Sequence, residues 1–147
     1  MGFFSRILEN RVLIIALVSW TVAQVGKVFF EIWLNKKVDF KRFVGSGGMP
    51  SSHSAFVMAL STSIGRLQGW DSPLFAIAIS YAFVVMYDAA GVRRAAGKQA
   101  EILNIILKDV IEHKVLKEER LKELIGHTPV EVIIGAILGV IIANIMV

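Results

Sequence analysis

The stretch "GSGGMPSSHSAFVMAL", from Gly45 to Leu60, joins a glycine-rich polar segment to a long apolar one. Pro50 and a pair of serines follow the glycines, and His53 stands where the apolar run begins. Proline is tolerated in the first turn of a helix, and the unpaired amides of that turn favour negative charge. The stretch therefore predicts a helix that enters a membrane from an anion-binding end, with His53 placed for chemistry.

The composition of this 147-residue chain is typical of a small membrane protein. Hydrophobic residues make up 55% of it, charged residues only 19%, and the mean hydropathy is +0.64. The absence of cysteine excludes disulfides, thiol catalysis and cysteine-ligated zinc. The net charge is +4, and the charged residues lie between the apolar segments. They form no basic stripe interleaved with aromatic residues. We therefore expect membrane lipids, and no nucleic acid, as partners.

Four apolar segments reach or approach the roughly 20 residues that a membrane-spanning helix needs. They cover residues 12–34, 54–67, 73–87 and 128–147. Between the last two, residues 94–124 carry apolar side chains at helical spacing among many charges, which predicts a surface or soluble amphipathic helix. The expected fold is a single-domain, all-α integral membrane bundle of about four transmembrane helices plus this amphipathic helix. So few helices make a thin bundle, which favours a homo-oligomer.

The first apolar segment contains three polar residues about one helical turn apart, Gln24, Lys27 and Glu31. Charges inside a span avoid lipid, so this face should look into the bundle. An internal pair between Lys27 and Glu31 is the structural interpretation of this face. A functional role is the alternative.

The alternation of the spans brings the charged residues and histidines that could form a site to one face of the membrane, although they are distant in the sequence. These residues are Lys41, His53, Asp88, Arg93, Arg94 and His127. The short loops at this face also carry more Lys and Arg than the opposite loops, which predicts a cytoplasmic location for it.

A second histidine motif, "GHTPVE", runs from Gly126 to Glu131. Thr128 suits an N-cap and Pro129 the first helical position. His127 and Glu131 are four residues apart, so a shared helix would let the carboxylate orient and polarise the imidazole. Two histidines, a carboxylate, cations and helix-start amides suit phosphoryl transfer through a phosphohistidine, a scheme that needs no metal and no cofactor.

A third motif, "YDAAGVRRAAGKQ", from Tyr87 to Gln99, supplies two arginines suited to phosphate oxygens. Asp88 could pair with Arg93 or Arg94, or it could serve a substrate or a metal. Ser51 and Ser52 could be helix caps as readily as ligands. The "DAAGVR" stretch also resembles the start of the CDP-alcohol phosphotransferase motif, but the later aspartates of that motif are missing.

At "PSSH" and "HTPVE" the chain resembles the divergent branch of the type 2 phosphatidic acid phosphatase and vanadium haloperoxidase superfamily. The resemblance implies His127 as nucleophile, Glu131 as its orienting carboxylate and His53 as the acid for the leaving group. It also implies Lys41 as a phosphate-binding lysine. The other expected phosphate-binding residues are Arg93, Arg94, Ser51, Ser52 and Gly48.

The sequence departs from the superfamily pattern in several places. Ser52 stands where the Pro-Ser-Gly-His motif has glycine, and Glu131 stands where the third motif has aspartate. Leu121 occupies the position of the arginine expected six residues before His127, so Arg93 or Arg94 is expected to take over. The predicted function is a membrane phosphatase acting on a lipid or isoprenoid phosphate or pyrophosphate. The alternative is a non-catalytic scaffold or transporter with an anion pocket, which would gain nothing from Glu131.

Overall fold

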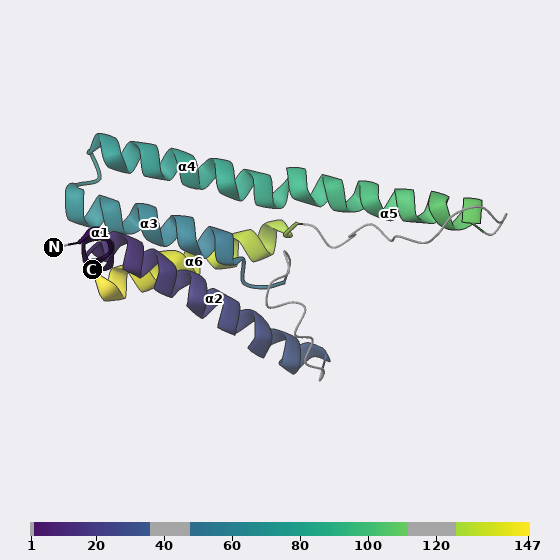
Figure 1. The fold of residues 1–147 in the computed structure, drawn as a ribbon, viewed down its shortest axis with the longest axis horizontal. Helices are drawn as coiled ribbons and strands as arrows, with labels where there is room; N and C mark the ends of the chain where they lie inside the picture. The colour runs from purple at the N-terminus through teal and green to yellow at the C-terminus, as the bar shows by residue number, and fades with distance from the viewer. Residues whose placement is uncertain (1, 36–47, 112–125) are drawn as a thin grey trace.

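A computed structural model describes residues 2–35, 48–111 and 126–147, and within these ranges it is built of helices without strands (Figure 1). The six helices are α1 (Phe3–Leu8), α2 (Arg11–Asn35), α3 (Ser52–Gln68), α4 (Pro73–Ala90), α5 (Val92–Ile111) and α6 (Pro129–Met146). The all-α bundle expected from the sequence is thereby confirmed.

The centre of the bundle is α3, which packs against α2, α4 and α6 (Figure 1). Its closest approach is to α6, through Gly135 and Gly139. A Cβ atom at these two positions would collide with the backbone carbonyl oxygens of Ser51 and Ala55. The small-residue face of α6 therefore serves packing within the chain.

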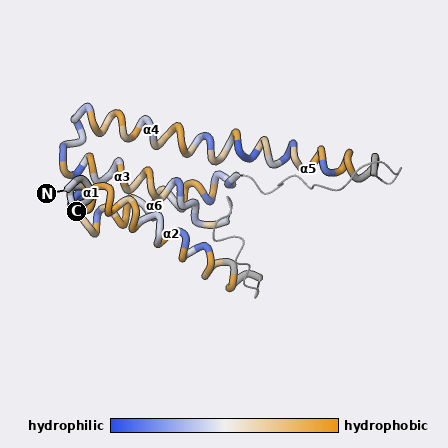
Figure 2. Tube along the Cα trace, viewed as in Figure 1, coloured by the Kyte–Doolittle hydropathy of each residue, from blue (hydrophilic) through white to orange (hydrophobic). Residues whose placement is uncertain are grey.

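In the part of the chain that the structure describes, three stretches are long and apolar enough to cross a membrane: Arg11–Phe30, Pro73–Leu107 and Pro129–Met146. Figure 2 shows the apolar character of α4 and α6. The expected second span, residues 54–67, differs from them. It lies in α3, which has 17 residues and buries Ser52, Ser54, Ser61, Thr62 and Ser63. A helix enclosed by neighbouring helices does not need an apolar surface toward lipid, which explains why α3 combines a central position with a polar composition.

The third predicted span extends past its expected end at residue 87 to Ala90. After Gly91, α5 continues in nearly the same direction and projects beyond the rest of the bundle (Figure 1). It is helical from Val92 to Ile111, slightly earlier than the expected start of the amphipathic segment, and residues 112–125 lie outside the described ranges. Its exposed apolar residues Ile102, Leu103, Ile105 and Ile106 agree with an amphipathic helix. Its position at a membrane surface stays a prediction.

The two ends of the bundle differ in chemistry. At the end that holds both termini and the α3–α4 turn, Arg66 Nη1 donates to the carbonyl oxygen of Asn144 at 2.9 Å and to its Oδ1 at 3.0 Å (Figure 1). This contact joins the last turns of α3 and α6. The opposite end, where α3 and α6 begin, carries both motif histidines.

Candidate active site

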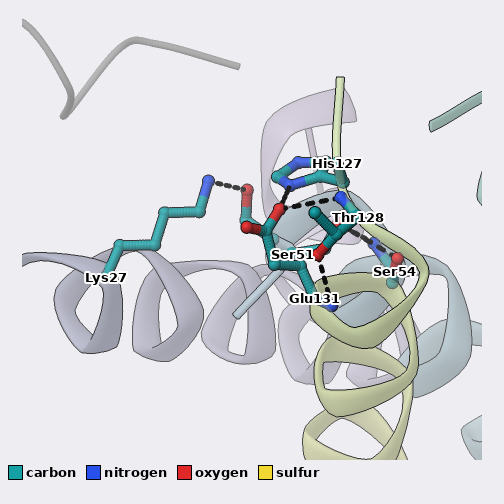
Figure 3. Close-up of polar contacts among 7 residues, drawn as sticks. Lys27, Ser51, Ser54, His127, Thr128 and Glu131 are labelled. Atoms are coloured by element: carbon teal, nitrogen blue, oxygen red, sulfur yellow. Dashed lines mark hydrogen bonds and ion pairs between the residues drawn. The ribbon is translucent and has the colours of Figure 1, made fainter. Parts of the chain in front are cut away.

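The site is built around His127, which precedes Thr128, the N-cap of α6, and so lies outside the helix that the spacing predicts it shares with Glu131. Its Nδ1 nevertheless lies 3.0 Å from Glu131 Oε2, so the expected pairing forms across the helix start (Figure 3). The same Oε2 accepts a hydrogen bond from Thr128 N at 3.1 Å, and Thr128 Oγ1 accepts from Glu131 N at 3.3 Å. This reciprocal capping fixes Glu131 in the first turn, with Pro129 at the position predicted for it. The local sequence therefore sets the orientation of the imidazole.

The end of α4 holds the backbone of His127. His127 N donates to the carbonyl oxygen of Ala89 at 2.9 Å. Gly126 has φ of +118°, and a Cβ there would collide with the backbone of Arg93 and Arg94. Glycine is needed at this position because of both the backbone angle and the close approach. The start of α6 is thus locked against the α4–α5 junction.

His53 reaches the same region from the first turn of α3. Its ring centroid lies 6.3 Å from that of His127, and the two ring planes are inclined by 61°. The expectation that the two imidazoles meet at one end of the bundle is confirmed. His53 is exposed, whereas His127 is only 1% exposed. The two rings therefore differ in access to solvent.

The Nε2 atom of His127 is buried and has no hydrogen-bond partner among the described residues. A buried ring nitrogen without a partner is uncommon and marks a candidate ligand position. Because Nδ1 faces a carboxylate, the proton of a neutral imidazole belongs on Nδ1. That assignment leaves the Nε2 lone pair available for a bond to an electrophile.

Burial lowers the pKa of His127 below its ordinary value of 6.5, because the charged imidazolium loses hydration. The hydrogen bond to Glu131 and the negative charge of Glu131 oppose this shift, while the positive charges of Lys27 and Arg93 add to it. The net effect favours the neutral imidazole near pH 7. Neutral imidazole is the form that can act as a nucleophile.

The serines at the start of α3 are caps and internal contacts. Ser51 is the N-cap of α3: its Oγ accepts from Ser54 N at 3.4 Å, and its backbone N donates to the carbonyl oxygen of Glu131 at 3.0 Å. Ser52 Oγ accepts a hydrogen bond from Lys27 Nζ at 3.2 Å. Both serines are buried. The Ser51 amide, expected to be available to an anion, is therefore used to hold α6 against α3.

Arg93 and Asp88 form an ion pair, with 2.7 Å between Nε and Oδ2. The pair bridges the end of α4 and the start of α5, which is the structural alternative considered for Asp88. The charge of Arg93 nevertheless acts on both His53 and His127. Arg94 is exposed, and its backbone contacts Gly126.

Two other predicted residues have different outcomes. Lys41 lies outside the described residues, so its placement stays a prediction. Gly48, just before α3, has φ of +85°, a backbone conformation that favours glycine. Within the described ranges, no group of three or more His, Asp or Glu residues is placed to hold a metal ion.

The sequence analysis did not connect Lys27 with the site. The sequence predicts that Lys27 faces the bundle interior, and its burial confirms this orientation. Its partner there is Ser52, and its charge interacts with that of Glu131. Figure 3 shows Lys27 extending from α2 toward this end of the bundle. The helical spacing gave the correct face of α2, but not the residues opposite it.

The helical fold and its long apolar helices define an all-α integral membrane protein. The sequence pattern of the family described as "Divergent PAP2 family" matches residues 8–142. The chain belongs to this family, which confirms the resemblance found in the sequence.

The chain is also similar to a curated protein of Bacillus subtilis (strain 168), named "Uncharacterized membrane protein YuiD". The two are 40% identical over 152 residues, covering 96% of each chain. No solved structure matches the chain significantly. These comparisons support a PAP2-like membrane protein.

Proposed function

We propose that the chain is a membrane phosphatase that hydrolyses a lipid or isoprenoid phosphate or pyrophosphate through a phosphohistidine on His127. The observation that carries this proposal is the environment of His127. Its Nδ1 faces Glu131, its Nε2 has no partner among the described residues, and His53 lies next to it. A nucleophile, an orienting carboxylate and a second acid–base group are thus within one small region.

In the first step, His127 Nε2 attacks phosphorus and a P–N bond forms as the P–O bond to the leaving group breaks. His53 in its protonated form donates its proton to the leaving oxygen, and Glu131 stabilises the positive charge that develops on the His127 ring. Burial and the nearby positive charges lower the pKa of His53 below 6.5, so acidic pH favours this proton transfer. In the second step, water attacks phosphorus and gives a proton to His53. The P–N bond breaks, and His127 and inorganic phosphate are released.

Access is a requirement of this mechanism. Because His127 Nε2 is buried, a phosphorus atom can reach it only after neighbouring groups shift. His53 is exposed and lies on the open side of the pair. Substrate would therefore approach from His53, with Arg93 close enough to influence the charges of both histidines.

The hydrophobic part of the proposed substrate has a matching feature in the bundle. An open groove with about 400 Å³ of space lies beside His53 among α2, α3 and α4. It is lined by Leu17, Trp20, His53, Phe56, Val57, Tyr81 and Val85. An apolar groove with a single imidazole suits a molecule whose phosphate is attached to a hydrocarbon tail. This supports a lipid or isoprenoid phosphate over a water-soluble phosphomonoester.

The test is release of inorganic phosphate by the purified protein from three substrates: a diacylglycerol phosphate, an isoprenyl pyrophosphate and a water-soluble phosphomonoester. We expect release from at least one of the first two. His127→Ala and His53→Ala should each reduce it at least about a hundredfold, because each removes a group that makes or breaks a bond. His113→Ala, which changes the chain's remaining histidine, is the matched control and should keep activity.

Full activity in either the His127 or the His53 variant would remove this mechanism. Vanadate resembles the phosphoryl group during transfer and supplies the second measurement. Binding of vanadate with no phosphate release from any substrate would favour the alternative, a scaffold or transporter with an anion pocket.

A further inference from the structure

Lys27 brings a positive charge from α2 into the interior of the bundle. The residue is 8% exposed, and it lies within the membrane-spanning stretch Arg11–Phe30. Removing an ammonium group from water costs several kcal/mol unless negative or polar partners compensate. A lysine in this position is therefore a functional candidate by default.

The surroundings of Lys27 are the residues already assigned to phosphate chemistry. Its Nζ donates to Ser52 Oγ at 3.2 Å, next to His53 in the first turn of α3. Its charge interacts with that of Glu131 and also acts on His53 and His127. Lys27 thus approaches the site from α2, which contributes neither histidine.

Among the described residues, Arg93 is the other cation whose charge acts on both histidines, and it differs from Lys27 in two respects. The Arg93 side chain is 44% exposed, and it is paired with Asp88 at 2.7 Å. Lys27 is buried, and the hydroxyl of Ser52 is a neutral acceptor for one of its three N–H donors. A buried charge interacts more strongly with an anion than an exposed, paired one does.

We propose that Lys27 is a phosphate-binding residue of this site, with its ammonium bound to non-bridging oxygens of a phosphoryl group at His127. This inference rests on the proposed function, because it assigns a ligand to the same site. Ser52 holds the ammonium in place, and the positive charge stabilises the negative charge of the bound phosphoryl group. In this arrangement α2 supplies the cation, α3 the acid and the start of α6 the nucleophile.

A purely structural role for Lys27 predicts different behaviour. If the lysine only joined helices, for example through Glu31, its loss would change stability and leave anion affinity unaltered. The side chain of Glu31 lies outside the described residues. Anion affinity of Lys27 variants therefore distinguishes a phosphate-binding role from a purely structural one.

The experiment is calorimetric titration of the detergent-purified full chain with orthovanadate and, separately, with inorganic phosphate. We expect Lys27→Met to weaken vanadate binding at least about tenfold, because a buried charge partner is lost. Lys27→Arg keeps the charge and should retain most of the affinity. Lys98→Met removes an exposed lysine on α5 and should bind as the wild type does.

Wild-type affinity in Lys27→Met would overturn the assignment, as would an equal loss in Lys98→Met. If the methionine variant does not fold, Lys27→Gln carries the same comparison. A second measurement is then made on Lys27→Arg. Vanadate should raise the unfolding temperature of this variant by as much as it raises that of the wild type. Absence of vanadate binding by the wild type itself would instead count against the proposed function, and against Lys27 with it.

Discussion

At the scale of single residues, the protonation of His127 is the property that the site controls most directly. Burial lowers the pKa of its imidazole, and Glu131 raises it in part. We expect an NMR titration of ring-labelled protein in detergent to give a midpoint below 6.5 for His127. In Glu131→Gln the midpoint should fall further, because the negative charge that stabilises the imidazolium is gone.

The sign of this shift also determines a pH effect on stability. The unfolded chain binds a proton on this histidine at a higher pH than the folded chain does. The contribution of His127 to the free energy of unfolding is therefore fully present above pH 6.5, the ordinary pKa. It is lost as pH falls from 6.5 toward the lower pKa of the folded chain. A midpoint at or above 6.5, or an upward shift in Glu131→Gln, would contradict the described environment. Rate profiles should show the same acid limb if His127 is the nucleophile.

At the scale of helices, the contact between α3 and α6 determines whether the two histidines meet. Gly135 and Gly139 allow the α6 backbone to approach the carbonyl oxygens of Ser51 and Ala55. We expect Gly139→Ala to destabilise the protein by about 1–3 kcal/mol, because the added methyl group overpacks this contact and the backbone cannot yield easily. Reversible unfolding in mixed micelles would measure the effect.

Gly2→Ala is the matched control for that substitution, because no atom lies within 4 Å of the added Cβ. It should leave the free energy of unfolding unchanged. Unaltered stability in Gly139→Ala would show that α3 and α6 are further apart than described. Gly135→Ala should additionally weaken vanadate binding, since Gly135 packs against Ser51 beside the site.

At the scale of the whole molecule, the site occupies one end of the bundle and the α3–α4 turn the other (Figure 1). The excess of short-loop Lys and Arg at the site end predicts that this end is cytoplasmic. The chain has no cysteine, so single substitutions can report its orientation. We expect Asp71→Cys to react with an impermeant maleimide in intact cells, and Ala95→Cys only after permeabilisation; both positions are exposed.

The reverse labelling pattern would place the site on the outer face of the membrane. The histidine geometry would be unaffected, but the source of substrate would change to the outer leaflet. Equal labelling of both positions in intact cells would contradict a bundle that spans the bilayer.

Local patterns in the sequence predicted much of this arrangement. Thr128, Pro129 and Glu131 form a helix start that depends on adjacent residues, so the pairing of Glu131 with His127 could be predicted from spacing. The alternation of apolar segments brought His53 to the end of the bundle that holds His127, because each helix reverses the direction of the chain. The family resemblance followed from the same short motifs.

Only the tertiary structure decided which faces of the helices meet. It placed the polar helix α3 at the centre, packed Gly135 against Ser51, and directed Lys27 toward Ser52. These contacts depend on the rotation and separation of helices that are distant in the sequence. The sequence alone determined the main helical segments, the Thr128 cap of α6 and the end of the bundle to which each motif belongs, because those depend on neighbouring residues. Packing between helices determined the contact partners of individual side chains, because only close contact selects one face of a helix over another.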